Sequence, residues 1–74
     1  MKRTASAVWT GNLKDENPQV RERAAIELGH IANPSTMPAL LAALADKNLE
    51  ARFAAIMAAD WVATQSRMAS ARSG

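Results

Sequence analysis

Six residues between Leu13 and Ala32 recur 31 positions later. Self-similarity at a fixed period of this length is typical of repeat proteins, in which each copy is one supersecondary unit stacked on the next. The repeat predicts two units, at about residues 4–32 and 35–63. The matched pairs are Leu13 with Leu44, Asp15 with Asp46, Asn17 with Asn48, Arg21 with Arg52, Ala24 with Ala55, and Ala32 with Ala63.

The first unit is predicted to be a pair of elements, of which the second is a helix. Residues 4–14 place apolar residues at helical spacing, but they also alternate well enough for a strand, so both interpretations stay open. Asn17 is a good N-cap and Pro18 suits the first helical position, which predicts a helix from Pro18 to about Ile31. Its expected apolar line is Val20, Ala24, Leu28 and Ile31.

The second unit is predicted to be a helix pair. Residues 33–35, Asn-Pro-Ser, break the preceding helix, since a residue before proline is disfavoured in the helical region. A third helix is expected over 36–45. A fourth should begin near Leu49 and end between Thr64 and Met68. The expected buried edge of the third helix is Met37, Leu40, Leu41 and Leu44.

At residues 13–63 the chain resembles the short HEAT-like repeats of the phycobilisome lyase type. The resemblance rests on the pattern of Leu, Asp, Val-Arg, Ala-Ala and Leu-Gly positions in LKDENPQVRERAAIELGHIANP, and on its looser copy in the second unit. It implies an all-α fold of two helix pairs in a short α-solenoid that serves as a scaffold or binding surface. The second unit departs from the pattern, with Ala59-Asp60 where the first has Leu28-Gly29, as terminal repeats often do.

Residues 1–15, MKRTASAVWTGNLKD, also resemble the opening strand of peroxide reductases of the OsmC type. Those enzymes need two reactive cysteines and this chain has no cysteine, so their activity does not carry over. The resemblance suggests a chimeric or recombined sequence and favours a strand at the N-terminus. An engineered or chimeric folded domain with no evolved function is therefore an alternative.

Composition excludes several classes of function. With no cysteine and one histidine, neither a metal site nor a cofactor is expected. The chain has no long apolar run and no signal-like start, which predicts a cytoplasmic protein without a membrane span. Its 74 residues allow one domain with a thin core, assigned to 1–66, followed by a flexible basic tail at 67–74.

The net charge of +2 is concentrated at the two ends of the chain. Residues 10–66 hold five basic and seven acidic side chains, whereas the ends carry basic side chains alone. Basic ends can contact phosphates, but so few charges more often serve solubility. We therefore do not expect nucleic-acid binding as the main function, and weak nucleic-acid association through the basic ends is the alternative. The basic residues concerned are Lys2, Arg3, Arg67 and Arg72.

Two aspartates and two arginines form a predicted turn ladder: Asp15 with Arg21, and Asp46 with Arg52. An aspartate just before a helix accepts backbone N–H groups, and an arginine early in that helix can reach back to it. We interpret this spacing as structural rather than catalytic.

Asp60 and Trp61 are the other candidates for chemistry. HEAT-like DNA glycosylases use an aspartate and tryptophans, but Asp60 is expected on the side of the helix opposite its alanine line, in water. No catalytic residue is assigned and the chain is predicted not to be an enzyme.

The fourth helix is apolar on two sides, and one of them lacks an obvious cover. The matching positions in the second helix are mostly polar. Either the N-terminal segment or the tail folds over this surface, or a second chain covers it. We predict a homodimer or another protein partner, so the chain is expected to be a protein-binding or self-associating module. The predicted interface is Phe53, Ile56, Met57, Trp61 and Ala63.

Overall fold

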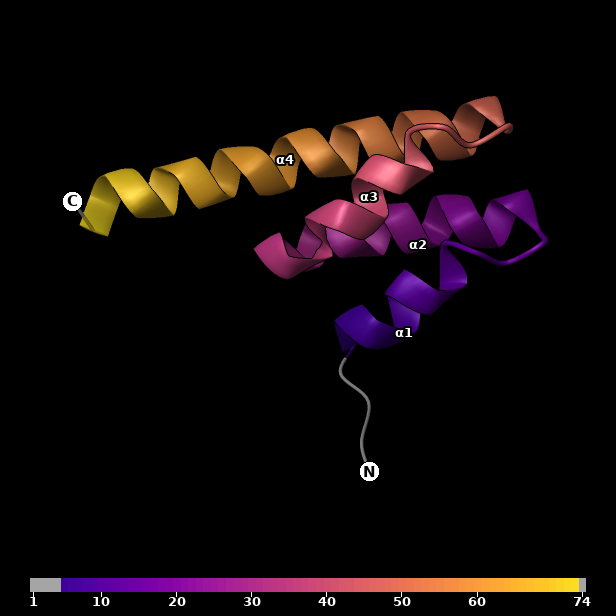
Figure 1. The fold of residues 1–74 in the computed structure, drawn as a ribbon, viewed down its shortest axis with the longest axis horizontal. Coiled ribbons are helices and arrows are strands. Elements are labelled where there is room, and N and C mark those ends of the chain that lie inside the picture. Colours follow the sequence, from indigo (N-terminus) through magenta and orange to yellow (C-terminus); the bar gives the residue numbers. More distant parts are fainter. Residues whose placement is uncertain (1–4, 74) are drawn as a thin grey trace.

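The computed structural model describes residues 5–73, which form helices and turns and no strand (Figure 1). The two helix pairs predicted from the repeat are present. Residues 5–12 are helical, so the strand interpretation of this segment is wrong. The elements are α1 (Ala5–Asn12), α2 (Pro18–Ile31), a 3-10 turn η1 (Pro34–Thr36), α3 (Met37–Ala43) and α4 (Leu49–Ser73).

Caps at both ends of α2 explain its bounds. The Asn17 side chain accepts the Gln19 N–H at 2.9 Å, and Pro18, which has no N–H to leave unpaired, occupies the first turn. At the other end Ala32 is left-handed, with φ of 55°, and its N–H bonds to the Leu28 carbonyl. Asn33 then caps η1 by accepting the Ser35 N–H. The predicted helix from Pro18 to Ile31 is confirmed at both ends.

The core lies where α2 and α3 pack on α4, and small side chains dominate it. Among the side chains that the structure describes, the large ones fully buried there are Leu28, Leu40 and Val62. Two predictions of burial are wrong: Leu41 is 53% exposed and Ile31 is 39% exposed. Leu41 is about 100° around the helix from Leu40, which is the residue that α3 turns into the core. The alanines that complete the buried cluster are Ala25, Ala55, Ala58 and Ala59.

The fourth helix is longer than predicted, since α4 continues to Ser73. Its sequence contains neither glycine nor proline, whereas an Asn-Pro step follows α2 and stops the first unit. Of the α4 side chains described, up to residue 69, the last that is fully buried is Val62. Residues 64–73, which we call the α4 extension, run past the other helices in Figure 1. The flexible tail at 67–74 stays a prediction, and Gly74 lies outside the described residues.

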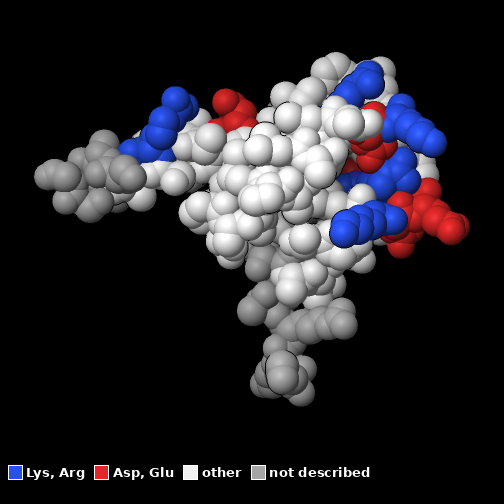
Figure 2. Space-filling model, in the orientation of Figure 1, with Lys and Arg blue, Asp and Glu red and all other residues white. Residues whose placement is uncertain are grey.

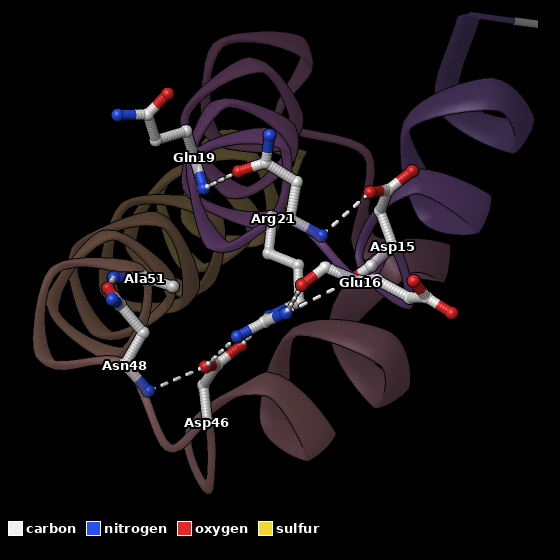
Figure 3. A network of polar contacts seen from close by, with 8 residues as sticks. Asp15, Glu16, Gln19, Arg21, Asp46, Asn48 and Ala51 are labelled. Atoms are coloured by element: carbon white, nitrogen blue, oxygen red, sulfur yellow. Dashed lines mark hydrogen bonds and ion pairs between the residues drawn. The ribbon is translucent and has the colours of Figure 1, made fainter.

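An ion pair joins the turn of the first unit to that of the second (Figure 3). The Arg21 guanidinium donates two hydrogen bonds to the Asp46 carboxylate, at 2.7 and 3.0 Å, and two more to the carbonyl oxygens of Asp15 and Glu16. Asp46 also accepts the Asn48 N–H at 2.9 Å. The Asp46 side chain is only 8% exposed, so the pair is shielded from water on that side.

The observed partner of Arg21 differs from the one predicted within the ladder. Arg21 pairs with Asp46 of the next unit rather than with the Asp15 carboxylate, which accepts the Asn17 N–H instead. The hydrogen bond from Arg21 holds the pKa of Asp46 below its ordinary value, against the opposing effect of burial, and the Asn48 N–H and the charge of Arg52 assist it. The same bond raises the pKa of Arg21. Both groups are charged wherever the chain is folded near neutral pH.

We expect Asp46→Ala to lower the free energy of unfolding by about 1–2 kcal/mol, because Arg21 and the Asn48 N–H both lose their acceptor. For a domain of this size each kcal/mol corresponds to roughly 4–8 °C in melting temperature. Thermal unfolding followed by circular dichroism measures the change. Asp15→Ala is the matched control, since that exposed carboxylate holds the Asn17 N–H and should cost less. Equal losses for the two variants would contradict a special role of the Arg21–Asp46 pair.

The ion pair should also make stability depend on pH. Because the pKa of Asp46 is lowered by folding, its contribution is complete above the unfolded value of about 3.9 and is lost as pH falls through the folded value. The difference in unfolding free energy between the unmodified chain and Asp46→Asn should thus be constant near neutral pH and shrink below about pH 4. Urea titrations at several pH values measure it. A difference that grows as the pH falls would have the wrong sign for this mechanism.

Candidate protein-binding surface

A groove runs between α2 and α4, and its floor is set by one close helix contact. A Cβ built on Gly29 would lie 3.1 Å from the Ala58 Cβ and 3.2 Å from the Ala58 Cα, so glycine is what lets the two helices approach this closely here. The groove has a volume of about 660 Å³, within the range of ligand pockets. Its lining is Glu22, Ile26, Gly29 and His30 of α2 and Glu50, Phe53, Ala54, Met57, Ala58, Asp60 and Trp61 of α4.

The α4 wall of this groove carries large apolar side chains that face water. Met57 is 71% exposed, and Phe53 and Trp61 are each more than half exposed. Their spacing of four residues puts them along one side of the helix. Met68 in the α4 extension, also half exposed, falls on the same side at about 100° per residue. We call Phe53, Met57, Trp61 and Met68 the α4 stripe.

The predicted interface is only partly one surface. The structure brings Phe53, Met57 and Trp61 together in the groove, but Ile56 and Ala63 are absent from its lining. Helical geometry places Ile56 about 100° around the helix from Met57. The α2 half of the groove could not be predicted from the sequence, because it depends on how α2 and α4 cross. Met68 was within reach, since it continues the helical spacing of the stripe.

The charges around the groove are acidic. Glu22, Glu50 and Asp60 line it, and His30 is the only other ionisable side chain among its lining residues. Figure 2 shows Lys and Arg side chains at the end of the molecule that holds the inter-helix turns, where Asp and Glu side chains also lie, and on the protruding arm of α4. An apolar groove with an acidic rim favours a partner that is apolar and basic.

The described residues show no arrangement for metal chemistry, since no group of three or more His, Asp or Glu side chains lies close enough to hold an ion. Asp60 and His30 are exposed rather than enclosed. Within the same residues, none of the helices has the length and apolar character needed to cross a membrane. Of the basic residues predicted at the ends, Lys2 and Arg3 and the side chain of Arg72 lie outside the described part of the chain.

Two stacked helix pairs joined by a turn ladder define the molecule as a short α-solenoid. The family model of HEAT repeats matches residues 6–71, nearly the whole chain, and the protein therefore belongs to the HEAT-repeat family. None of the curated proteins matches it. HEAT repeats are typically non-catalytic scaffolds that mediate protein–protein interaction. Both helices that line the groove are the second helices of their units.

The Gly29–Ala58 contact can be tested with a matched glycine. We expect Gly29→Ala to lower the melting temperature, because its new methyl group pushes against the backbone of α4. Gly11→Ala in α1, where the space around the glycine is open, should instead gain about 0.5–1 kcal/mol from helix propensity. The two variants should differ by about 1–3 kcal/mol in unfolding free energy. If they are equally stable, the close contact does not limit the approach of the helices.

Proposed function

We propose that this protein is a non-catalytic protein-interaction module that self-associates as a homodimer through the α4 stripe and the groove beside it. One observation carries the proposal. Phe53, Met57 and Trp61 expose half or more of their surface on α4, whereas Glu22, Ile26 and His30 stand at the same repeat positions on α2. An apolar row of this kind on a small protein usually marks an interaction site.

The chain's own described segments do not cover this row. The α1 helix packs against α2, and no α1 residue lines the groove. The α4 extension belongs to the same continuous helix as the row, so it points along the helix axis and cannot fold back over it. Cover by residues 5–14 or by 64–73 of the same molecule is thus disfavoured, and this supports cover by a second chain.

The small core also supports association. With three large side chains fully buried, the core alone offers a small domain limited stability, and a partner would add to it.

A regular third repeat is a poor alternative for covering α4. The position equivalent to Gly29 in the second unit is Asp60. Its side chain would occupy the space that the corresponding helix of a third unit would need in order to approach α4 as closely as α4 approaches α2. The helix also continues through the point where the first unit turns. Both features favour a partner that lies along α4 rather than one that stacks as α4 stacks on α2.

Four other predictions from the sequence are not needed for this proposal. The phycobilisome lyase type of repeat, a cytoplasmic location, the weak nucleic-acid alternative and a chimeric or engineered origin all stay predictions. The strand that the resemblance to peroxide reductases implied is absent from residues 5–12, which removes one reason for a chimera. The acidic groove argues against phosphate binding at this surface.

Met57→Asp should convert the homodimer into a monomer. It puts a charge at the most exposed residue of the stripe, where a large apolar side chain buried in an interface contributes about 1.5–3 kcal/mol. Sedimentation equilibrium at tens of micromolar measures the mass, and circular dichroism verifies that the helices remain.

Val8→Asp is the matched control for this change. Val8 is a half-exposed apolar residue on α1, away from the groove, and the variant should remain dimeric. A well-folded monomer for the unmodified chain would overturn self-association and leave the groove for a different protein.

A further inference from the structure

We propose that in the homodimer the α4 extension of each copy lies antiparallel across the groove of the other. This inference rests on the proposed self-association and specifies what occupies the groove: residues 64–73 of a second copy. It assigns the stripe and the extension to one continuous contact, made twice about a two-fold axis.

The extension has the chemistry of an occupant. It runs past the other helices in Figure 1, and Arg67, Met68 and Ala69 in it are exposed. Met68 is half exposed on the side of α4 that carries Phe53, Met57 and Trp61. The molecule therefore contains both an exposed segment with an apolar side chain, the α4 extension, and an open apolar groove between α2 and α4.

Charge favours the same arrangement. The sequence from Trp61 to Gly74 contains Arg67 and Arg72 and no acidic residue, so the extension is a basic segment. The groove is lined by three acidic side chains and by neither lysine nor arginine. A second copy thus offers the apolar and basic partner that the groove favours, while the extension cannot reach the groove of its own molecule.

Helical spacing sets the register. Fifteen residues separate Phe53 from Met68, which is about 22 Å along a helix. With Trp61 of both copies near the two-fold axis, Met68 comes opposite Phe53 of the second copy and Thr64 opposite its Met57. Arg67 then lies about one helical turn from Glu50 of the second copy. A parallel arrangement would instead place each stripe residue opposite itself and bring the acidic rims together.

Cysteine cross-linking tests the register, and the chain has no cysteine of its own to interfere. Phe53→Cys and Met68→Cys are prepared separately, mixed in equal amounts and oxidised mildly, and linked peptides are identified by mass spectrometry. Disulfides form only where Cα atoms approach within about 7 Å. We expect a link between residues 53 and 68 in the mixture, little product from either variant alone, and a self-link for Trp61→Cys.

The alternative outcomes separate the two proposals. Self-links of 53 and of 68 would indicate a parallel dimer and overturn the antiparallel register while self-association stands. A dimer by sedimentation with neither kind of link would place the contact elsewhere and also overturn the inference. A monomer would reject both proposals.

A charge on the extension gives a second measurement. Met68→Glu should raise the dimer dissociation constant about tenfold or more, because it removes a large apolar contact. Ser66→Glu adds the same charge on the opposite side of the helix and should change the constant little. Equal effects of the two variants would show that the extension acts through its net charge and not through the stripe.

Discussion

The Arg21–Asp46 ion pair is the contact on which the relation between the two units depends. Four hydrogen bonds from one guanidinium hold three separate parts of the chain: the turn after α1, the start of α2 and the turn before α4. The planar, forked geometry of arginine suits this task. Two of its nitrogens donate to one carboxylate, while the third donates to the backbone carbonyls. With the two turns fixed together, α2 and α4 begin at the same end of the molecule and must run side by side.

Small side chains then decide how close those helices come. Gly29 and Ala58 meet at the crossing, and alanines fill most of the space between α2, α3 and α4. Close approach brings the backbones together but buries few large side chains, since volume at the crossing is limited. The bulky residues of α4, Phe53, Met57 and Trp61, are consequently displaced to the outside. The tight core and the exposed stripe are two results of the same packing.

Much of this could be predicted from the residues, and the failures have physical causes. The repeat and the Asn-Pro punctuation predicted α2 and α4 and the burial of Ala24 and Leu28, because caps and breakers act locally. The partner of Arg21 was assigned wrongly, since a spacing of six within one unit and a contact between units leave the same pattern in the sequence. The α2 side of the groove depends on the crossing of two helices, which no local signal reports. Leu41 was predicted to be buried and is exposed, because in a helix as short as α3 the apolar spacing fits more than one choice of buried face.

The second unit therefore combines the marks of an internal repeat with those of an end. It keeps the aspartate and the N-cap of the first unit, as Asp46 and Asn48, and Asp46 joins it to the first unit through Arg21. It has Asp60 in place of the glycine and no Asn-Pro step after its second helix, so a third unit could not stack on it in the same way. Apolar residues exposed on a helix of a solenoid favour a cover, which a capping segment, a further unit or a second copy can provide. Association of two copies through the same surface is closed and gives a dimer. Head-to-tail stacking would instead place the Arg23–Glu27 ion pair of α2 against the apolar side of α4, and it could continue into a filament. Closure by a two-fold axis avoids both the buried polar contact and the open filament.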